Sequence, residues 1–193
     1  MAATTGYWPN GKQIAVSFSV DDARASQAEV GFPILEELGA RATFYVVPSA
    51  MEKNLELWRA VSAAGHEIGN HSVHHPCSGN FTFARPHALE HYTLEQMEAE
   101  LLECNRQVHD LLGVVPRTFA YPCGQTFVGS GESLKSYIPL VAKHFLCGRL
   151  YMSEWHNTPG NMDRANLMGR NFDGVSFETF KEWVELARGE QGW

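Results

Sequence analysis

Strand-like and helix-like segments alternate along this chain, and this alternation constrains the fold more than any other feature of the sequence. Residues 14–20, IAVSFSV, alternate apolar and small residues with a period of two, which predicts a strand. Further strands are predicted at RATFYVV, HEIGN, RTFAYP and FLCGRLY. Short strands separated by helices favour parallel pairing through helical crossovers. Periodicity alone leaves two architectures open, a (β/α) barrel and a doubly wound sheet.

The intervening helices are recognised by their apolar spacing and by the residues at their ends. The clearest spans 93–112, with a capping box that begins at Thr93 and with Gly113 as its stop. In the first helix, apolar residues recur every four positions and predict an end near Gly39. These residues are Val30, Ile34 and Leu38. A last helix is predicted after Ser176, which has the side chain of an N-cap.

Composition limits the organisation and the partners of the chain. With 193 residues, 44% of them hydrophobic, one domain over 1–193 is expected. The net charge of −7 argues against nucleic acid as a partner. No apolar run reaches the roughly 18 residues of a membrane span. No signal peptide is recognised, so we expect a cytoplasmic protein or one whose leader was removed. The sequence does not indicate an oligomeric state.

The four cysteines do not form a recognisable pattern. They are Cys77, Cys104, Cys123 and Cys147, and no Cys-x-x-Cys pair occurs. A zinc ribbon is therefore not expected, and nothing in the spacing indicates a disulfide. Cys104 falls on the apolar face of the 93–112 helix and is predicted to be a small core residue.

Three groups with chemical potential follow predicted strands directly. Asp21 and Asp22 end the first strand, His71 and His75 follow the third, and the YPCG turn at 121–124 follows the fourth. In a parallel architecture the carboxyl ends of the strands meet on one face, which is where such folds bind ligands. We therefore expect these groups to lie close together.

The residue types in these groups suit a divalent cation. His71 and His75 are four residues apart, and two imidazoles with one carboxylate are a frequent ligand set for Zn²⁺ or a related ion. One aspartate could bind the cation while the other accepts a proton from water. The competing interpretation is a solvated histidine loop, with Asp22 capping the next helix and Asp21 in solvent.

The segments SFSVDDA, HSVHHP and FAYPCG, in this order, resemble the first three motifs of the polysaccharide deacetylases, carbohydrate esterase family 4. The resemblance implies a distorted (β/α) barrel with fewer than eight strands and an active site at the C-terminal ends of the strands. It implies Asp21 as the catalytic base and Ser72 as a support of the histidine loop. The metal ligands that it implies are Asp22, His71 and His75.

The implied reaction is the metal-assisted hydrolysis of an acetamide or acetyl ester on a sugar. Zn²⁺ is the expected cation, with Co²⁺, Ni²⁺ and Mn²⁺ as alternatives. The backbone N–H of Cys123 would bind the oxyanion of the tetrahedral intermediate. Substrate contacts are expected from Tyr121, Pro122 and Trp155. An acetylated carbohydrate is the expected partner.

Two departures from the family pattern leave other functions open. Ala120 stands where an arginine usually pairs with the catalytic aspartate, a role that Arg24 or Arg170 could take instead. The family's last motif, Leu-x-His with a general acid, has no counterpart, and His144 and His156 are weak substitutes. We therefore expect that a C-terminal strand is missing. The alternative functions are hydrolysis of a small amide or cyclic imide, and an inactive metal- or glycan-binding relic.

Overall fold

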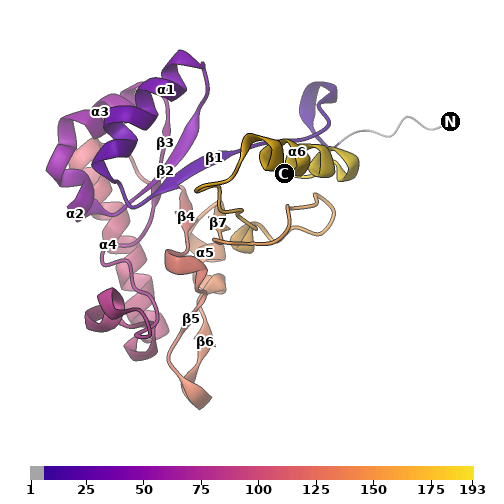
Figure 1. Cartoon of the computed structure of the whole chain (residues 1–193). Helices are drawn as coiled ribbons and strands as arrows, with labels where there is room; N and C mark the ends of the chain where they lie inside the picture. The colour runs from indigo at the N-terminus through magenta and orange to yellow at the C-terminus, as the bar shows by residue number, and fades with distance from the viewer. Residues whose placement is uncertain (1–6) are drawn as a thin grey trace.

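A parallel sheet of five strands runs through the centre of the computed structural model, which describes residues 7–193 (Figure 1). Its strand order is β1-β2-β3-β4-β7, and every neighbouring pair is parallel. The strands are β1 Phe18–Asp21, β2 Ala42–Val46, β3 Glu67–Asn70, β4 Thr118–Ala120 and β7 Cys147–Arg149. They curl into a half-barrel, which confirms the predicted barrel with fewer than eight strands.

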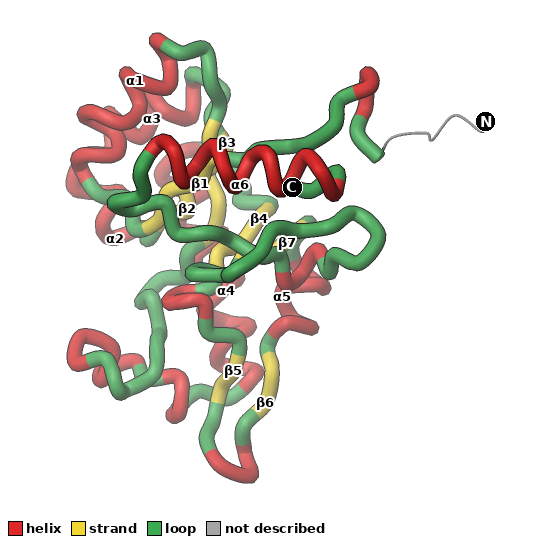
Figure 2. The backbone as a smooth tube through the Cα atoms, turned by 45° about the vertical axis from the view of Figure 1, so that its right-hand side comes forward, coloured by secondary structure: helices red, strands yellow, loops and turns green. Residues whose placement is uncertain are grey.

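Helices connect the strands and cover one side of the sheet (Figures 1 and 2). They are α1 Phe32–Glu37, α2 Pro48–Met51, α3 Leu55–Ala63, α4 Leu94–Leu112, α5 Ile138–His144 and α6 Phe177–Glu190. An antiparallel hairpin of β5 Phe127–Val128 and β6 Lys135–Ser136 projects away from the sheet. No helix within the described part of the chain is long and apolar enough to cross a membrane. Residues 1–6, where part of a signal peptide was sought, lie outside the described residues.

Alternation along the strands sets which residues line the inner face of the half-barrel. Asp21 pairs in register with Tyr45, and Tyr45 pairs with Gly69. A Cβ atom on Gly69 would lie 2.4 Å from the Tyr45 ring, so only glycine leaves room for that ring. The strand sequence HEIGN therefore needs its glycine to let Tyr45 lie flat against β3.

The helix predicted over 93–112 is confirmed in detail. Thr93 and Gln96 form the reciprocal capping box, and Gly113 takes the left-handed conformation at the C-terminal end, with φ 72°. Its buried residues include Met97, Leu101, Cys104 and Val108, all on the predicted apolar stripe. Cys104 contacts the hydrophobic cluster between the sheet, α1, α3 and α4 and is a core residue, as predicted.

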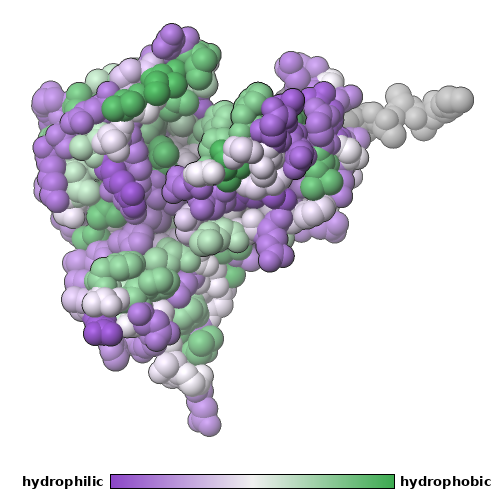
Figure 3. All heavy atoms as spheres, in the orientation of Figure 1, coloured by the Kyte–Doolittle hydropathy of each residue, from purple (hydrophilic) through white to green (hydrophobic). Residues whose placement is uncertain are grey.

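The face of the first helix that packs on the sheet is not the face predicted from its strongest apolar repeat. A π-helical turn precedes α1 at Gln27–Gly31, and the wider turn shifts the phase of the side chains. Residues packed on the sheet are Ala28, Phe32 and Leu35. The repeat of Val30, Ile34 and Leu38 is at least half exposed and contributes to the apolar surface over α1 (Figure 3).

The last residues of the chain lie beside the beginning of the first strand. Ser176 caps α6 by accepting a hydrogen bond from the Thr179 N–H, as its position predicts. Beyond α6, the Gly192 carbonyl accepts a hydrogen bond from the Ala15 N–H at 3.2 Å. Trp193 and Asn157 exchange two backbone hydrogen bonds of 2.8 Å. Backbone hydrogen bonds therefore join the last residues to the segment before β1 and to Asn157, although residues 191–193 are not in a strand.

Candidate metal centre

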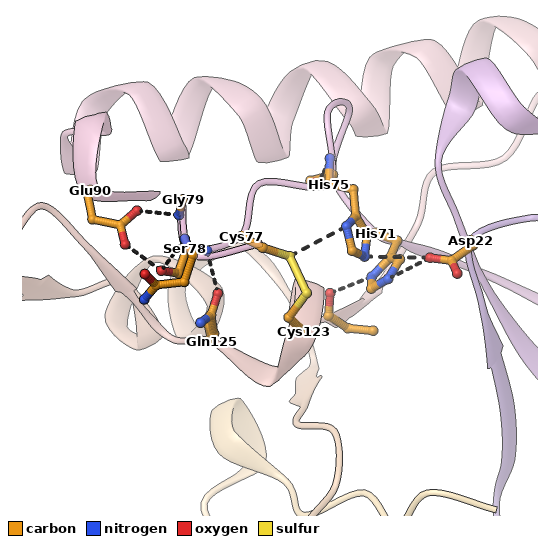
Figure 4. The surroundings of a disulfide bond; sticks show 12 residues. Asp22, His71, His75, Cys77, Ser78, Gly79, Glu90, Cys123 and Gln125 are labelled. Atoms are coloured by element: carbon orange, nitrogen blue, oxygen red, sulfur yellow. Dashed lines mark hydrogen bonds and ion pairs between the residues drawn. A yellow bond between two sulfur atoms is a disulfide. The ribbon is translucent and has the colours of Figure 1, made fainter. Parts of the chain in front are cut away.

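Asp22, His71 and His75 converge at the carboxyl ends of β1 and β3 (Figure 4). The Nε2 atoms of both histidines lie 3.5 Å from the same oxygen, Oδ1 of Asp22. One ligand atom from each of the three residues lies within 4.8 Å of the other two. The convergence expected from the strand ends is therefore present in the fold.

Backbone strain brings the carboxylates into place. Asp22 has φ 81° and Ala23 has φ 55°, so the chain turns left-handed directly after β1. This turn directs Asp22 to the histidines, while Asp21 stays in the inward phase of the strand. Ala23 takes this conformation at a steric cost that a glycine would not have.

Each histidine is held in a defined orientation. Nδ1 of His71 donates a hydrogen bond of 2.8 Å to the Ala120 carbonyl, which leaves the Nε2 lone pair facing Asp22. Nδ1 of His75 lies 3.6 Å from Sγ of Cys77. Burial, together with the neighbouring His71, lowers the pKa of His75 to about 4. The His75 ring is consequently neutral at neutral pH and offers its lone pair.

The Asp22 carboxylate is ionised under the same conditions. The close contact with the His71 ring, opposed by burial and helped by Arg24, holds the pKa of Asp22 well below its usual range. Nη2 of Arg24 lies 2.9 Å from Oδ2 of Asp22. One anionic oxygen and two neutral imidazoles form a donor set that fits Zn²⁺ or a related divalent ion.

The loop that carries the histidines contains two left-handed residues, Ser72 with φ 63° and His75 with φ 51°. Ser72 stabilises the loop through its backbone and its side chain. Its N–H donates to Oδ1 of Asn70, and its Oγ accepts from the His75 N–H at 3.0 Å. This is the loop contact that the resemblance implies for Ser72.

A buried carboxylate on α4, Glu100, secures the middle of this loop and was not recognised in the sequence. Its Oε1 accepts hydrogen bonds from the backbone N–H groups of Val73 and His74, at 3.0 and 2.6 Å. Its Oε2 lies 2.9 Å from Nδ1 of His74, and the residue is only 7% exposed. The signal that could have revealed it is a charged residue on the apolar stripe of the helix.

We expect Glu100→Gln to weaken metal binding. The neutral amide oxygen is a weaker acceptor than the anionic carboxylate oxygen that accepts from both backbone N–H groups. Groups that orient metal ligands typically contribute about 10- to 100-fold in affinity. Competitive titration with a chromophoric chelator should show a loss of about 10-fold for Glu100→Gln and a larger loss for Glu100→Ala. Glu103→Gln, one turn along α4, should bind like the wild type. An unchanged affinity in Glu100→Gln with a folded chain would contradict this role.

Asp21 is paired with an arginine that sequence reasoning missed. The guanidinium of Arg149, on β7, donates from Nη2 to Oδ1 of Asp21 and lies 5.0 Å from the centroid of the Tyr45 ring. The two candidates named from the sequence are engaged elsewhere. Arg24 pairs with Asp22, and Arg170 lies over Trp183 and donates to the Glu154 carbonyl. The expectation that Arg24 or Arg170 would take this place is therefore wrong.

Strand register explains how Arg149 takes the place of the arginine that is absent at position 120. Ala120 and Arg149 are register partners in β4 and β7, so both occupy the last inward-facing position of their strands. The guanidinium consequently reaches Asp21 from the neighbouring strand. The sequence signal was its place at the end of FLCGRLY, but only the strand order shows that it crosses the half-barrel to Asp21.

We expect Arg149→Met to leave metal binding unchanged and to reduce kcat/KM about 10- to 100-fold, because Asp21 would lose its orientation. Arg149→Lys should recover only part of this loss, since an ammonium group does not reproduce the planar stacking of a guanidinium on Tyr45. Arg170→Met is the matched control and should retain activity. Equal kcat/KM in Arg149→Met and wild type would show that Asp21 does not depend on this pair.

The turn after β4 reaches the histidines through a disulfide bond between Cys77 and Cys123 (Figure 4). The sequence analysis found no indication of this bond, because the two cysteines are 46 residues apart and only the fold brings them together. Cys123 has φ 54° within the turn. The turn therefore lies beside the histidine loop, the position that the predicted oxyanion role of Cys123 requires.

The other predicted substrate residues have different positions. Tyr121 is 1% exposed, and its hydroxyl donates to the Ala165 carbonyl at 2.6 Å. Pro122 is also buried. Neither side chain is available to a substrate, so both contacts lack support from the fold. Trp155 is 43% exposed and stacks on His156, which leaves its predicted role as a prediction.

The two histidines considered as general acids both have carboxylate partners. Nε2 of His144 lies 2.6 Å from Oε1 of Glu98, and Nε2 of His156 lies 3.1 Å from Oε2 of Glu190. These contacts tie His144 to α4 and His156 to α6, and neither ring takes part in the Asp22 cluster within the described residues.

Comparison with known proteins gives a family match and a shared fold. The sequence model of a family described as polysaccharide deacetylase matches residues 9–137, more than half of the chain. Chitin deacetylase 1 of Cryptococcus neoformans is 31% identical over 170 residues, which cover 85% of this chain and 32% of that protein. The chain spans about a third or less of the length of the first curated relatives that it matches.

Solved structures show the same fold. The Streptococcus pyogenes deacetylase PplD in complex with acetate has a TM-score of 0.66 at 19% identity, over 87% of this chain and 69% of that chain. BA3943 of Bacillus anthracis, described as a CE4 family pseudoenzyme, has a TM-score of 0.51 at 19% identity, over 69% and 41%. At these identities the likeness concerns the fold alone.

Proposed function

Because this chain belongs to the polysaccharide deacetylase family, we propose that it is a metal-dependent hydrolase that removes acetyl groups from a carbohydrate. The observation that carries the proposal is the cluster of Asp22, His71 and His75, in which two Nε2 atoms face one carboxylate oxygen at 3.5 Å. Two imidazoles and one carboxylate directed to a common point form a ligand set that a divalent ion uses.

The three residues of the cluster would hold the cation, with Zn²⁺ as the first choice and Co²⁺, Ni²⁺ or Mn²⁺ as alternatives. The bound ion would supply a Lewis acid that polarises the acetyl carbonyl and lowers the pKa of water toward neutrality. Asp21 would accept the proton from the attacking water, with Arg149 holding its carboxylate in place. The backbone N–H of Cys123 would donate to the developing oxyanion.

The position of Arg149 favours the carbohydrate deacetylase over the small-amide hydrolase. The main reason to consider a small amide or cyclic imide was the missing arginine at Ala120. Arg149 pairs with Asp21 and so provides the cation that the family arrangement uses at this place. An inactive relic is kept as an outcome of the test, since a pseudoenzyme also has this fold.

The test combines metal analysis with a substrate screen. The purified chain, loaded with Zn²⁺ or Co²⁺, is incubated with acetylated chitooligosaccharides, acetylxylan and a cyclic imide, and acetate or ring opening is measured. We expect one metal per chain and release of acetate from a carbohydrate, both absent in Asp22→Ala. Turnover of the imide alone would replace the proposed substrate class. Metal binding without turnover of any substrate would identify a relic.

A further inference from the structure

His75 belongs to two clusters of potential metal ligands at once. Its Nε2 faces Asp22, while its Nδ1, on the opposite edge of the ring, faces Sγ of Cys77 at 3.6 Å (Figure 4). Ligand atoms of His75, Cys77 and Cys123 also lie within 4.8 Å of one another. In the disulfide form the two sulfurs are bonded to each other and cannot act as thiolate ligands.

The spacing of this second cluster is that of a zinc site. Zn–N bonds of about 2.0 Å and Zn–S bonds of about 2.3 Å at a tetrahedral angle place the nitrogen and sulfur roughly 3.5 Å apart. Nδ1 of His75 and Sγ of Cys77 lie 3.6 Å apart, which is close to that separation. After reduction the sulfurs of Cys77 and Cys123 need to move from a covalent bond to about 3.8 Å, the separation of two thiolates on one tetrahedral ion.

We propose that reduction of the Cys77–Cys123 disulfide creates a second metal site, formed by the two thiolates and Nδ1 of His75, which competes with Asp22 and His71 for that histidine. Thiolates favour soft ions, so Zn²⁺ and Co²⁺ bind there more tightly than Mn²⁺. The new site uses only His75 and the two cysteines, whereas its competition with Asp22 and His71 rests on the proposed function.

A dithiol can reduce the Cys77–Cys123 disulfide by two successive thiol–disulfide exchanges. Cys77 is fully buried, whereas Cys123 is partly exposed, so a reductant thiolate attacks the sulfur of Cys123 and releases Cys77. The second thiol of the reductant then closes its own disulfide and frees Cys123. Two electrons and two protons pass to the chain. Binding of the cation releases the two thiol protons to solvent.

The tautomer of His75 explains why the two sites exclude each other. A neutral imidazole carries one proton, and the nitrogen without it is the one that can ligate. With the disulfide intact, the proton on Nδ1 faces sulfur and Nε2 is the ligand. When Nδ1 binds the cation, the proton is on Nε2, and the Asp22 cluster loses one of its three ligands. One metal per chain is therefore expected in both redox states.

Cobalt absorption of the Asp22→Ala variant tests the proposal separately from the proposed function. Sulfur-to-cobalt charge transfer gives near-ultraviolet absorption that carboxylate and imidazole ligands do not. We expect oxidised Asp22→Ala to bind little Co²⁺, and the same chain reduced with a phosphine to bind one Co²⁺ with this absorption. Cobalt bound to oxidised Asp22→Ala would contradict the metal triad of the proposed function and leave the new site unaffected.

Cysteine variants complete the test. Cys77→Ser and Cys123→Ser, made in the Asp22→Ala chain, should abolish the thiolate absorption, and His75→Ala should weaken it. Cys147→Ser is the matched control, because burial raises the pKa of the Cys147 thiol to about 11 and it lies outside the cluster. Absence of thiolate absorption in the reduced chain, its persistence in Cys77→Ser, or loss of the folded circular dichroism on reduction would overturn the proposal.

Discussion

Asp22→Ala is expected to abolish stoichiometric metal binding in the oxidised chain. Asp22 is the anionic member of the cluster, and its Oδ1 is the atom that both histidines face at 3.5 Å. Without it, two neutral imidazoles remain, and Arg24 loses its partner beside them. Residues that only hydrogen-bond to metal ligands typically contribute about 10- to 100-fold to metal affinity. Loss of the ligand itself should therefore weaken affinity by more than about 100-fold. Equilibrium dialysis with metal analysis measures this loss.

The control for Asp22→Ala is Asp110→Ala. Asp110 lies near the end of α4 and forms an exposed ion pair with Arg106, an interaction that contributes little to stability. The Asp110→Ala substitution removes the same charge as Asp22→Ala and should leave metal content and activity at the wild-type level. If folded Asp22→Ala still retains one tightly bound metal, the cation is held by other residues and the proposed site is incorrect.

Asp21→Asn is expected to separate metal binding from turnover. The amide keeps the shape of the side chain but is not a base, and among the described residues Asp21 forms its ion pair with Arg149 and none with His71 or His75. Removal of a general base costs typically 10²- to 10⁴-fold in rate, so kcat should fall by about that factor while metal content stays at one per chain. Release of acetate from the carbohydrate identified in the screen measures the rate.

Comparison of Asp21→Asn with Arg149→Met gives the internal control for this division of roles. Arg149 acts on the reaction only through Asp21, so the arginine substitution should have little further effect in the Asp21→Asn background. If Asp21→Asn also strips the metal, both aspartates are ligands and the assignment of a base is wrong. A full additional loss from Arg149→Met would show that the arginine has a separate role.

Much of the candidate site was predictable because it depends on local sequence. Asp21 and Asp22 end a strand, and His71 and His75 follow the next but one along the chain. Parallel strands place their carboxyl ends on one face whatever their order in the sheet. Thr93 and Gly113 likewise mark the ends of α4 through hydrogen bonds with near neighbours.

Other features depend on register or on phase, which the sequence does not state. Arg149 reaches Asp21 only because β7 lies next to β4, an arrangement decided by strand order. The repeat of Val30 and Ile34 was a sound helix signal, yet the π-helical turn before α1 directs another stripe to the sheet. Glu100 was hidden because its partners are backbone groups of a loop that lies 26 and 27 residues earlier.

By itself, the sequence determined the alternation of strands and helices and the chemical types at the strand ends, since both follow from periodicity and short-range spacing. Only the tertiary structure decided which arginine pairs with Asp21, that Cys77 and Cys123 are bonded, and that His75 faces carboxylate on one edge and sulfur on the other. The physical reason is that each of these contacts joins residues from different elements, and their distance is set by packing of the whole sheet.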